Sequence, residues 1–211
     1  MRLIVIGTEY TGKTTLLDEI QAWSRDKLGI HNHLDDHFSI PDRQMLRSEE
    51  HQKIMVGLPG VLKERFQRFQ VAYHVRLINK YEDIILGGFH IEEVVYGPRY
   101  YYPEIGRLAE TPRAWEEGMP KDTIMCLLTA SPDVIKQRTK DDPHEYPVVP
   151  ESDIEECQAE FEREYRQCWF RRRLQIDTSE LTPDQLLSQF LSDVVPHLNE
   201  RDLAIRNARG V

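Results

Sequence analysis

The stretch that decides the expected fold is MRLIVIGTEYTGKTT, at residues 1–15 of this 211-residue chain. Residues 3–6 form a continuous apolar run of the kind found in buried strands. The spacing Gly7-x-x-x-x-Gly12-Lys13-Thr14 follows directly, and apolar residues then recur at helical spacing at Leu16, Leu17 and Ile20. The stretch therefore predicts a buried strand, a glycine-rich turn and a helix in direct succession.

The glycine-rich turn has the residue types that a phosphate-binding loop needs. Its two glycines allow positive φ angles and a close approach of the backbone to an anion, so that successive amide N–H groups can surround phosphate oxygens. Lys13 supplies positive charge for the outer phosphates, and the hydroxyl of Thr14 can ligate Mg²⁺. The helix that begins near Lys13 directs its positive end at the same phosphates. We therefore expect ATP and Mg²⁺ to bind here, with the metal on Thr14 and the nucleotide on Gly7, Thr8, Glu9, Tyr10, Thr11, Gly12, Lys13, Thr14 and Thr15.

Composition and charge exclude several classes of protein. Hydrophobic residues make up 40% of the chain, which suits one α/β domain, and no apolar run approaches the roughly 20 residues that span a bilayer. The formal net charge of −9 argues against binding to nucleic acid, which requires a positive face. The three cysteines lack metal-ligand spacing, and the N-terminus has the pattern of a core strand and not of a signal peptide. These features predict a cytoplasmic protein that acts on a small molecule, without a membrane or nucleic-acid partner, and they leave a homodimer open.

Apolar strands and helical segments alternate along the chain, which is typical of a parallel sheet covered by helices on both faces. Strands are expected at residues 2–6, 31–34, 83–86, 123–128 and 173–176. Helix starts are predicted at Ser131 and Thr182, each followed by proline and aspartate, and at a capping box in residues 152–155. The longest helix is expected over residues 60–80, with a core-facing stripe that comprises Phe66, Phe69, Tyr73 and Leu77.

Acidic residues follow the second predicted strand, at the sheet edge where ligands bind in open α/β folds. Asp35 and Asp36 are therefore candidates for the general base that accepts or orients the nucleophile in phosphoryl transfer. Side chains alternate along an extended segment, so one alternative is that only one of the two faces the cleft. Arg138 lies two turns into a later helix and could stabilise charge on the γ-phosphate as a catalytic group, or else lie on a solvated helix face.

A further set of residues is expected to bind the phosphoryl acceptor. Arg65 and Arg68 lie one turn apart on the long helix and could hold an acceptor phosphate. Glu92 and Glu93 follow the third predicted strand and could hold Mg²⁺ through water or bind a sugar hydroxyl, with Glu93 preferred. Tyr96 is expected to line the acceptor pocket.

Several segments together resemble the thymidylate-kinase-like branch of P-loop kinases, which includes nucleoside monophosphate kinases and has deoxynucleoside kinases as relatives. They are residues 7–15, 89–97, 127–138 and 176–179. The resemblance implies a three-layer α/β P-loop NTPase fold with a five-stranded parallel sheet flanked by helices. It implies a single domain over residues 1–198 with a small lid at about 138–152. The polar stretch at 199–211 is expected to be a C-terminal tail or short helix. It further implies transfer of the γ-phosphate of ATP to a nucleotide or nucleoside, with Asp177 on the adenine side.

The end of the third strand departs from that family. Its members usually carry Asp-Arg or Glu-Arg there, where the acid supports Mg²⁺ and the arginine contacts the acceptor, whereas this chain has Gly87-Gly88. One of the acids at residues 35–36 or 92–93 could replace the missing acid, and Arg99 or Arg68 the arginine. Two other functions therefore stay open: a kinase of a non-nucleotide small molecule, and a regulatory or degenerate P-loop protein that binds nucleotide without turnover.

Overall fold

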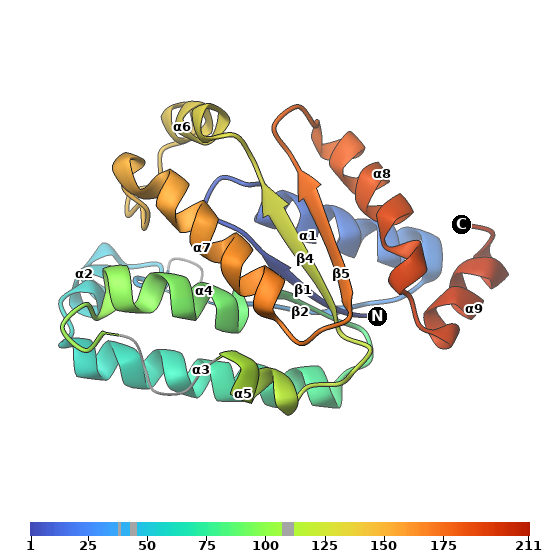
Figure 1. The fold of residues 1–211 in the computed structure, drawn as a ribbon, viewed down its shortest axis with the longest axis horizontal. Coiled ribbons are helices and arrows are strands. Elements are labelled where there is room, and N and C mark those ends of the chain that lie inside the picture. Colours follow the sequence, from blue (N-terminus) through green and yellow to red (C-terminus); the bar gives the residue numbers. More distant parts are fainter. Residues whose placement is uncertain (38, 43–45, 107–111) are drawn as a thin grey trace.

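The computed structural model describes residues 1–37, 39–42, 46–106 and 112–211. Within these residues five strands form one parallel sheet in the order β2-β3-β1-β4-β5, with β1 at its centre (Figure 1). Helices cover both faces of this sheet, so the predicted three-layer fold is confirmed. The strands are β1 (Arg2–Ile6), β2 (His33–Asp36), β3 (Ile84–Gly87), β4 (Ile124–Thr129) and β5 (Arg172–Asp177).

Helical segments connect the strands, and the longest of them, α3, has the predicted bounds. The helices are α1 (Lys13–Trp23), α2 (Glu49–Val56), α3 (Gly60–Lys80), α4 (Phe89–Tyr96), α5 (Pro112–Glu117), α6 (Pro132–Asp141), α7 (Ile154–Gln167), α8 (Pro183–Asp193) and α9 (Glu200–Arg209), and the shorter turns are η1 (Ser24–Leu28), η2 (Gly97–Tyr101), η3 (Glu151–Asp153) and η4 (Val195–His197). None of the helices in the described part of the chain has the length and apolar composition needed to cross a membrane.

Alternate residues of the central strand point to opposite faces of the sheet, as the two-residue period of a strand requires. Ile4 and Ile6 of β1 lie in one buried apolar cluster with residues of α3, α4 and α7. Leu3 and Val5 lie in a second cluster with residues of α1 and α8. Because both faces are covered, the central strands are apolar at nearly every position, which is the pattern that the sequence showed at residues 3–6.

The predicted helix starts have different outcomes. The hydroxyl of Ser131 accepts a hydrogen bond from the Val134 amide at the start of α6. Thr182 and Gln185 form a complete capping box at the start of α8. The capping box predicted at residues 152–155 is wrong, because the turn η3 precedes α7 and Asp153 makes no side-chain capping bond.

The second strand begins two residues later than predicted, and this correction moves both candidate acids into the sheet. β2 pairs with β3 in the register Asp35↔Leu86 and Asp36↔Gly87. The two aspartates are therefore the last residues of β2 and do not follow it. Their side chains must point to opposite sides of the sheet.

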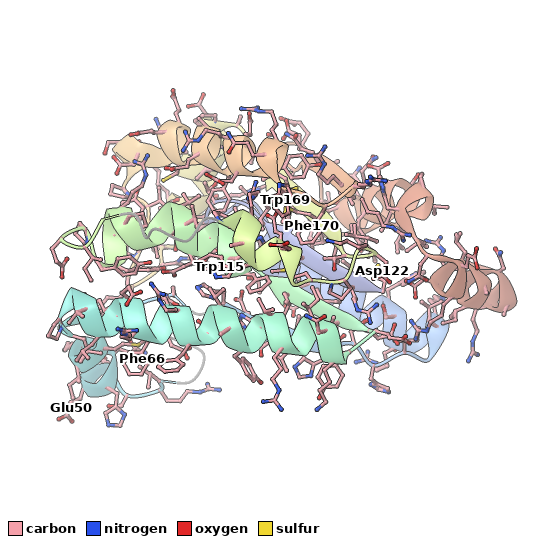
Figure 2. The ribbon with its side chains drawn as sticks, turned by 60° about the horizontal axis from the view of Figure 1, so that its bottom comes forward. Glu50, Phe66, Trp115, Asp122, Trp169 and Phe170 are labelled. Carbon is pink, nitrogen blue, oxygen red and sulfur yellow. The ribbon has the colours of Figure 1, made fainter. Side chains whose placement is uncertain are left out.

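The prediction that Phe66, Phe69 and Tyr73 are core residues is wrong. Their side chains are 49%, 74% and 50% exposed, and only Leu77 of that stripe is buried. Figure 2 shows Phe66 on the side of α3 away from α4. The buried face of α3 carries polar residues, among them His74, because it covers buried polar groups at the end of the sheet. Hydrophobic periodicity therefore indicated the wrong face of this helix.

Candidate active site

The phosphate loop, residues 7–12, connects β1 to α1 at the carboxyl end of the sheet. Gly12 has a φ angle of 90°, in the left-handed region that residues with a Cβ rarely adopt. A Cβ at Gly7 would lie 2.5 Å from the carbonyl oxygen of Leu128, so glycine lets the loop approach β4. Because α1 begins at Lys13, its first amide groups have no partner within the helix and are open to an anion at this loop.

Lys13 lies between the phosphate loop and the helix that follows β3. Its Nζ donates a hydrogen bond of 2.6 Å to the carbonyl oxygen of Gly7 and is 3.2 Å from Oε2 of Glu92 on α4. The Glu92 side chain is about one-tenth exposed, so this ion pair is largely shielded from water. A shielded pair is screened less by salt than an exposed one, so the two charges influence each other strongly.

Asp36 and Glu92 occupy the space that side chains at positions 87 and 88 would need. A Cβ at Gly87 would overlap Oδ1 of Asp36, and a Cβ at Gly88 would overlap the carboxylate of Glu92. The glycine pair at the end of β3 therefore leaves room for two carboxylates beside Lys13. They come from β2 and α4, the two elements that flank this point of the sheet in space.

Burial dominates the titration of both carboxylates. It raises the pKa of Asp36 above its ordinary value, although the charge of Lys13 opposes the shift. Burial also raises the pKa of Glu92 to about 7, against the opposing effect of Lys13. A carboxylate whose pKa lies near neutrality can both release and take up a proton under physiological conditions.

Asp35 lies on the other side of β2 and does not line the cleft at the phosphate loop. Its Oδ2 is 3.5 Å from Nε2 of His74 on α3. Partial burial opposes ionisation of Asp35, but His74, the Asp36 amide and His33 together outweigh this effect and lower its pKa. Of the two candidate bases, the structure thus brings Asp36 to the phosphate loop.

The loop between α6 and η3, residues 142–150, contacts the phosphate loop directly. Glu9 accepts hydrogen bonds from the amides of Val148 and Val149, at 2.7 and 3.0 Å, and it is 3.2 Å from Nδ1 of His144. The ring of Tyr10 stacks on the ring of His144 with a centroid distance of 4.4 Å. Burial opposes ionisation of Glu9, but these hydrogen bonds outweigh it and lower its pKa. Hydrogen bonds and ring stacking therefore join the phosphate loop to the expected lid.

Arg138 of α6 also holds the phosphate loop. Its guanidinium donates to the carbonyl oxygen of Tyr10 at 2.9 Å and to both oxygens of Thr178, at 3.1 and 2.7 Å. Arg138 and Thr178 both line the cleft, whereas Asp177 accepts hydrogen bonds from the backbone and hydroxyl of Ser179 and does not line it. The observed bonds of Arg138 position the loop, and its contact with a γ-phosphate stays a prediction.

The predicted acceptor residues do not gather at one place. Arg65 is exposed, and Arg68 forms a 2.8 Å ion pair with Glu64, so the two arginines lie outside the cleft lining. Glu93 is buried behind the cleft, where it contacts the hydroxyl of Tyr102 and lies 3.2 Å from Nε2 of His37. Burial raises the pKa of Glu93 well above its ordinary value.

Tyr96 does line the cleft. Its hydroxyl accepts a hydrogen bond of 3.1 Å from the amide of Glu9, and burial raises its pKa well above the usual range. Its neighbour one turn earlier, Glu92, is the acid that meets Lys13, although the sequence favoured Glu93. Consecutive helix residues point about 100° apart, so the rotation of α4 about its axis decides which glutamate reaches the cleft.

These side chains line one cleft of about 540 Å³ at the carboxyl end of the sheet. Eleven of the candidate site residues line it, namely Thr8, Glu9, Tyr10, Gly12, Lys13, Thr14, Thr15, Asp36, Glu92, Tyr96 and Arg138. Thr178 of the segment expected on the adenine side also lines the cleft, as do His144 and Leu186, which the sequence did not mark as site residues. Thr178 follows the predicted Asp177, but no local signal marks His144. Across the described residues, no group of three His, Cys, Asp or Glu side chains has the arrangement of a metal site.

Comparison with solved structures identifies the fold of this chain. No family model matches this chain, and no curated protein matches its sequence. The fold resembles that of the Bacillus subtilis YorR protein solved in complex with phosphorylated GDP, with 16% identity, a TM-score of 0.61 and coverage of 95% of this chain and 100% of the other.

Two solved kinases have similar folds. For the M. mycoides deoxyadenosine kinase with bound dATP, the identity is 17%, the TM-score is 0.57 and the coverage is 92% of this chain and 99% of the other. For the Candida albicans thymidylate kinase, the identity is 12%, the TM-score is 0.55 and the coverage is 94% of each chain. These values show that the chain has the fold of P-loop kinases, and at such identities they show the fold alone.

Proposed function

We propose that this protein is a kinase that transfers the γ-phosphate of ATP to a nucleotide or nucleoside. The observation that carries the proposal is the convergence of Lys13, Asp36 and Glu92 in one cleft at the phosphate loop. Phosphoryl transfer requires that the phosphates be positioned and their charge neutralised, and that an acid orient the nucleophile. The fold shared with solved nucleoside and nucleotide kinases supports the same class of reaction.

The residues of the chain fit ATP and Mg²⁺. The amides of the phosphate loop and of the first turn of α1 provide donors for phosphate oxygens. Thr14 lines the same cleft and offers a hydroxyl oxygen of the kind that Mg²⁺ binds, and the carboxylates of Asp36 and Glu92 can accept hydrogen bonds from the water molecules that the ion keeps. When bound, Mg²⁺ neutralises charge on the β- and γ-phosphates.

Each residue then has a defined task in the proposed reaction. Lys13 stabilises the negative charge that develops on the migrating phosphoryl group. Asp36 accepts a hydrogen bond from the nucleophile and orients it, and its raised pKa suits it to take up the proton. Residues 142–150, held by Glu9 and Tyr10, act as a lid that excludes water from the transferred group.

The proposal is tested by measuring ADP formation from ATP·Mg²⁺ with a panel of nucleosides and nucleoside monophosphates. We expect slow hydrolysis of ATP alone and much faster turnover with an acceptor, and we expect Lys13→Ala to abolish transfer. Asp36→Asn should lower kcat far more than it weakens ATP binding, because the side chain acts on the nucleophile. Turnover retained in Lys13→Ala would refute the assignment of the site. Binding of ATP without turnover for any acceptor would favour a regulatory or degenerate protein.

A further inference from the structure

The cleft has two halves that meet at the phosphate loop. The strand order β2-β3-β1-β4-β5 places β4 and β5 on one side of β1 and places β2 and β3 on the other. Arg138 and Thr178 line the cleft on the first side. The second side, here called the acceptor half, is lined by residues that follow or end β2 and by residues of α4, namely Asp36, His37, Ser39, Glu92 and Tyr96.

The acceptor half contains the carboxylates of Asp36 and Glu92. They lie in the space that side chains at Gly87 and Gly88 would otherwise fill. Lys13, which lies between this half and the phosphate loop, is paired with Glu92 at 3.2 Å. A phosphate group on the acceptor would lie next to both carboxylates. They repel it, because charges in a partly buried site are poorly screened.

Among the residues that the structure describes, three basic side chains near the acceptor half are engaged by carboxylates other than Asp36 and Glu92. His37 is buried, and its Nε2 lies 3.2 Å from Oε2 of Glu93, so this ring contacts a different carboxylate from the two in the acceptor half. Arg68 is paired with Glu64 on α3 and does not line the cleft. Arg99 is held at 2.8 Å by both Glu156 and Glu160 of α7, which lies on the far side of α4 from the long helix.

Hydroxyl-binding groups complete this half of the cleft. Tyr96 uses its hydroxyl oxygen to accept the Glu9 amide, which leaves its O–H to donate to a ligand. The carboxylates accept hydrogen bonds from hydroxyl groups. Ser39 also lines this half, and because its hydroxyl donates to the carbonyl oxygen of Pro41, it offers a ligand an acceptor. This set of donors and acceptors matches an alcohol and not a phosphate ester.

We infer that the phosphoryl acceptor is an alcohol that carries no phosphate group, such as a nucleoside or another neutral polyol, and that Asp36 and Glu92 reject its phosphorylated counterpart. This inference rests on the proposed kinase function and narrows its acceptor. In the transfer, the bond between the alcohol oxygen and Pγ forms while the bond from Pγ to the β,γ-bridging oxygen breaks. ADP leaves with that electron pair, and the hydroxyl proton passes to the carboxylate of Asp36.

The test uses matched acceptors that differ by a single phosphate: nucleosides and their 5′-monophosphates, and glycerol and glycerol 3-phosphate. Label transfer from γ-³²P-ATP gives kcat/KM for each member, and calorimetry in the presence of ADP·Mg²⁺ gives Kd. We expect the unphosphorylated member to be preferred by at least about 100-fold in kcat/KM, because like charges placed together in a specific site oppose binding strongly. In Glu92→Gln the ratio of Kd for the phosphorylated member to Kd for the unphosphorylated member should fall about tenfold. The control Glu155→Gln, at an exposed position, should keep the wild-type ratio.

The outcomes separate the inference from the function on which it rests. Transfer to the phosphorylated members with equal or greater kcat/KM would overturn the inference and leave the kinase function standing. If ATP binds but no label is transferred to any acceptor, the kinase function fails. The rejection of phosphorylated ligands by the acceptor half is then decided by Kd alone, and tighter binding of the phosphorylated members would overturn it.

Discussion

The raised pKa of Glu92 makes a quantitative prediction about stability. The pKa of this carboxyl is about 7 in the folded protein, compared with 4.5 for the unperturbed group. Between these two values the folded state binds more protons than the unfolded state does. The free energy of unfolding must therefore fall as the pH rises from about 4.5 to about 7 and then level off. A difference of about 2.5 pKa units corresponds to about 3 kcal/mol over this window.

The perturbation that isolates this contribution is Glu92→Gln, because glutamine has nearly the same shape and does not ionise. The quantity to compare is the free energy of unfolding of the variant minus that of the wild type. We expect this difference to be up to about 3 kcal/mol larger at pH 8 than at pH 5. The assay is urea denaturation of the nucleotide-free protein at a series of pH values, with the m-value checked for constancy. Glu155→Gln on the exposed face of α7 is the matched control.

The same group controls the expected pH dependence of activity. If ionised Glu92 is required beside Lys13, kcat/KM for ATP should rise with pH through an apparent pKa near 7, and this rise should disappear in Glu92→Gln. Parallel stability curves for the wild type and Glu92→Gln would refute the reasoning, since the carboxyl would then titrate alike in the folded and unfolded states.

Three other perturbations test separate parts of the site. Gly87→Ala should reduce kcat at least about tenfold with little change in ATP affinity, because the new Cβ displaces the Asp36 carboxylate. The control Gly118→Ala should behave as the wild type, because its Cβ would make only an ordinary contact at 3.5 Å. Equal activities of the two variants would contradict this account. Glu9→Gln should speed amide hydrogen exchange across residues 142–150 about tenfold or more, and unchanged exchange would show that Glu9 does not hold the lid. Thr182→Ala should lower the free energy of unfolding by about 1 kcal/mol in urea denaturation through loss of the capping box, and an unaltered midpoint would argue against it.

Contacts between residues close in sequence account for what could be predicted. The phosphate loop is recognisable because its glycines, Lys13 and Thr14 act within one turn of chain. The caps at Ser131 and Thr182 involve partners three residues away, so their pattern is visible in the sequence. The alternation of apolar runs with helices was enough to predict a parallel sheet with two covered faces, because its central strands need apolar residues on both sides.

The assignment of roles within the site required the tertiary structure. A shift of two residues in the start of β2 decides where the aspartates lie, and its register against β3 brings Asp36, and not Asp35, to Gly87. The rotation of α4 brings Glu92 to Lys13 and leaves Glu93 against His37. These positions depend on the packing of elements far apart in sequence, which no local pattern encodes.

The helix α3 shows the same division between local and tertiary determinants. Its bounds follow from the sequence, but its buried face does not, because the surface that it covers contains the buried polar groups of β2 and α4. The sequence by itself determined a phosphate loop on a parallel α/β sheet, since those features depend on local conformation and on apolar periodicity. Only the tertiary structure decided which carboxylates share the cleft with that loop, because the space for them is left by Gly87 at the end of the neighbouring strand β3 and by Gly88 directly after it.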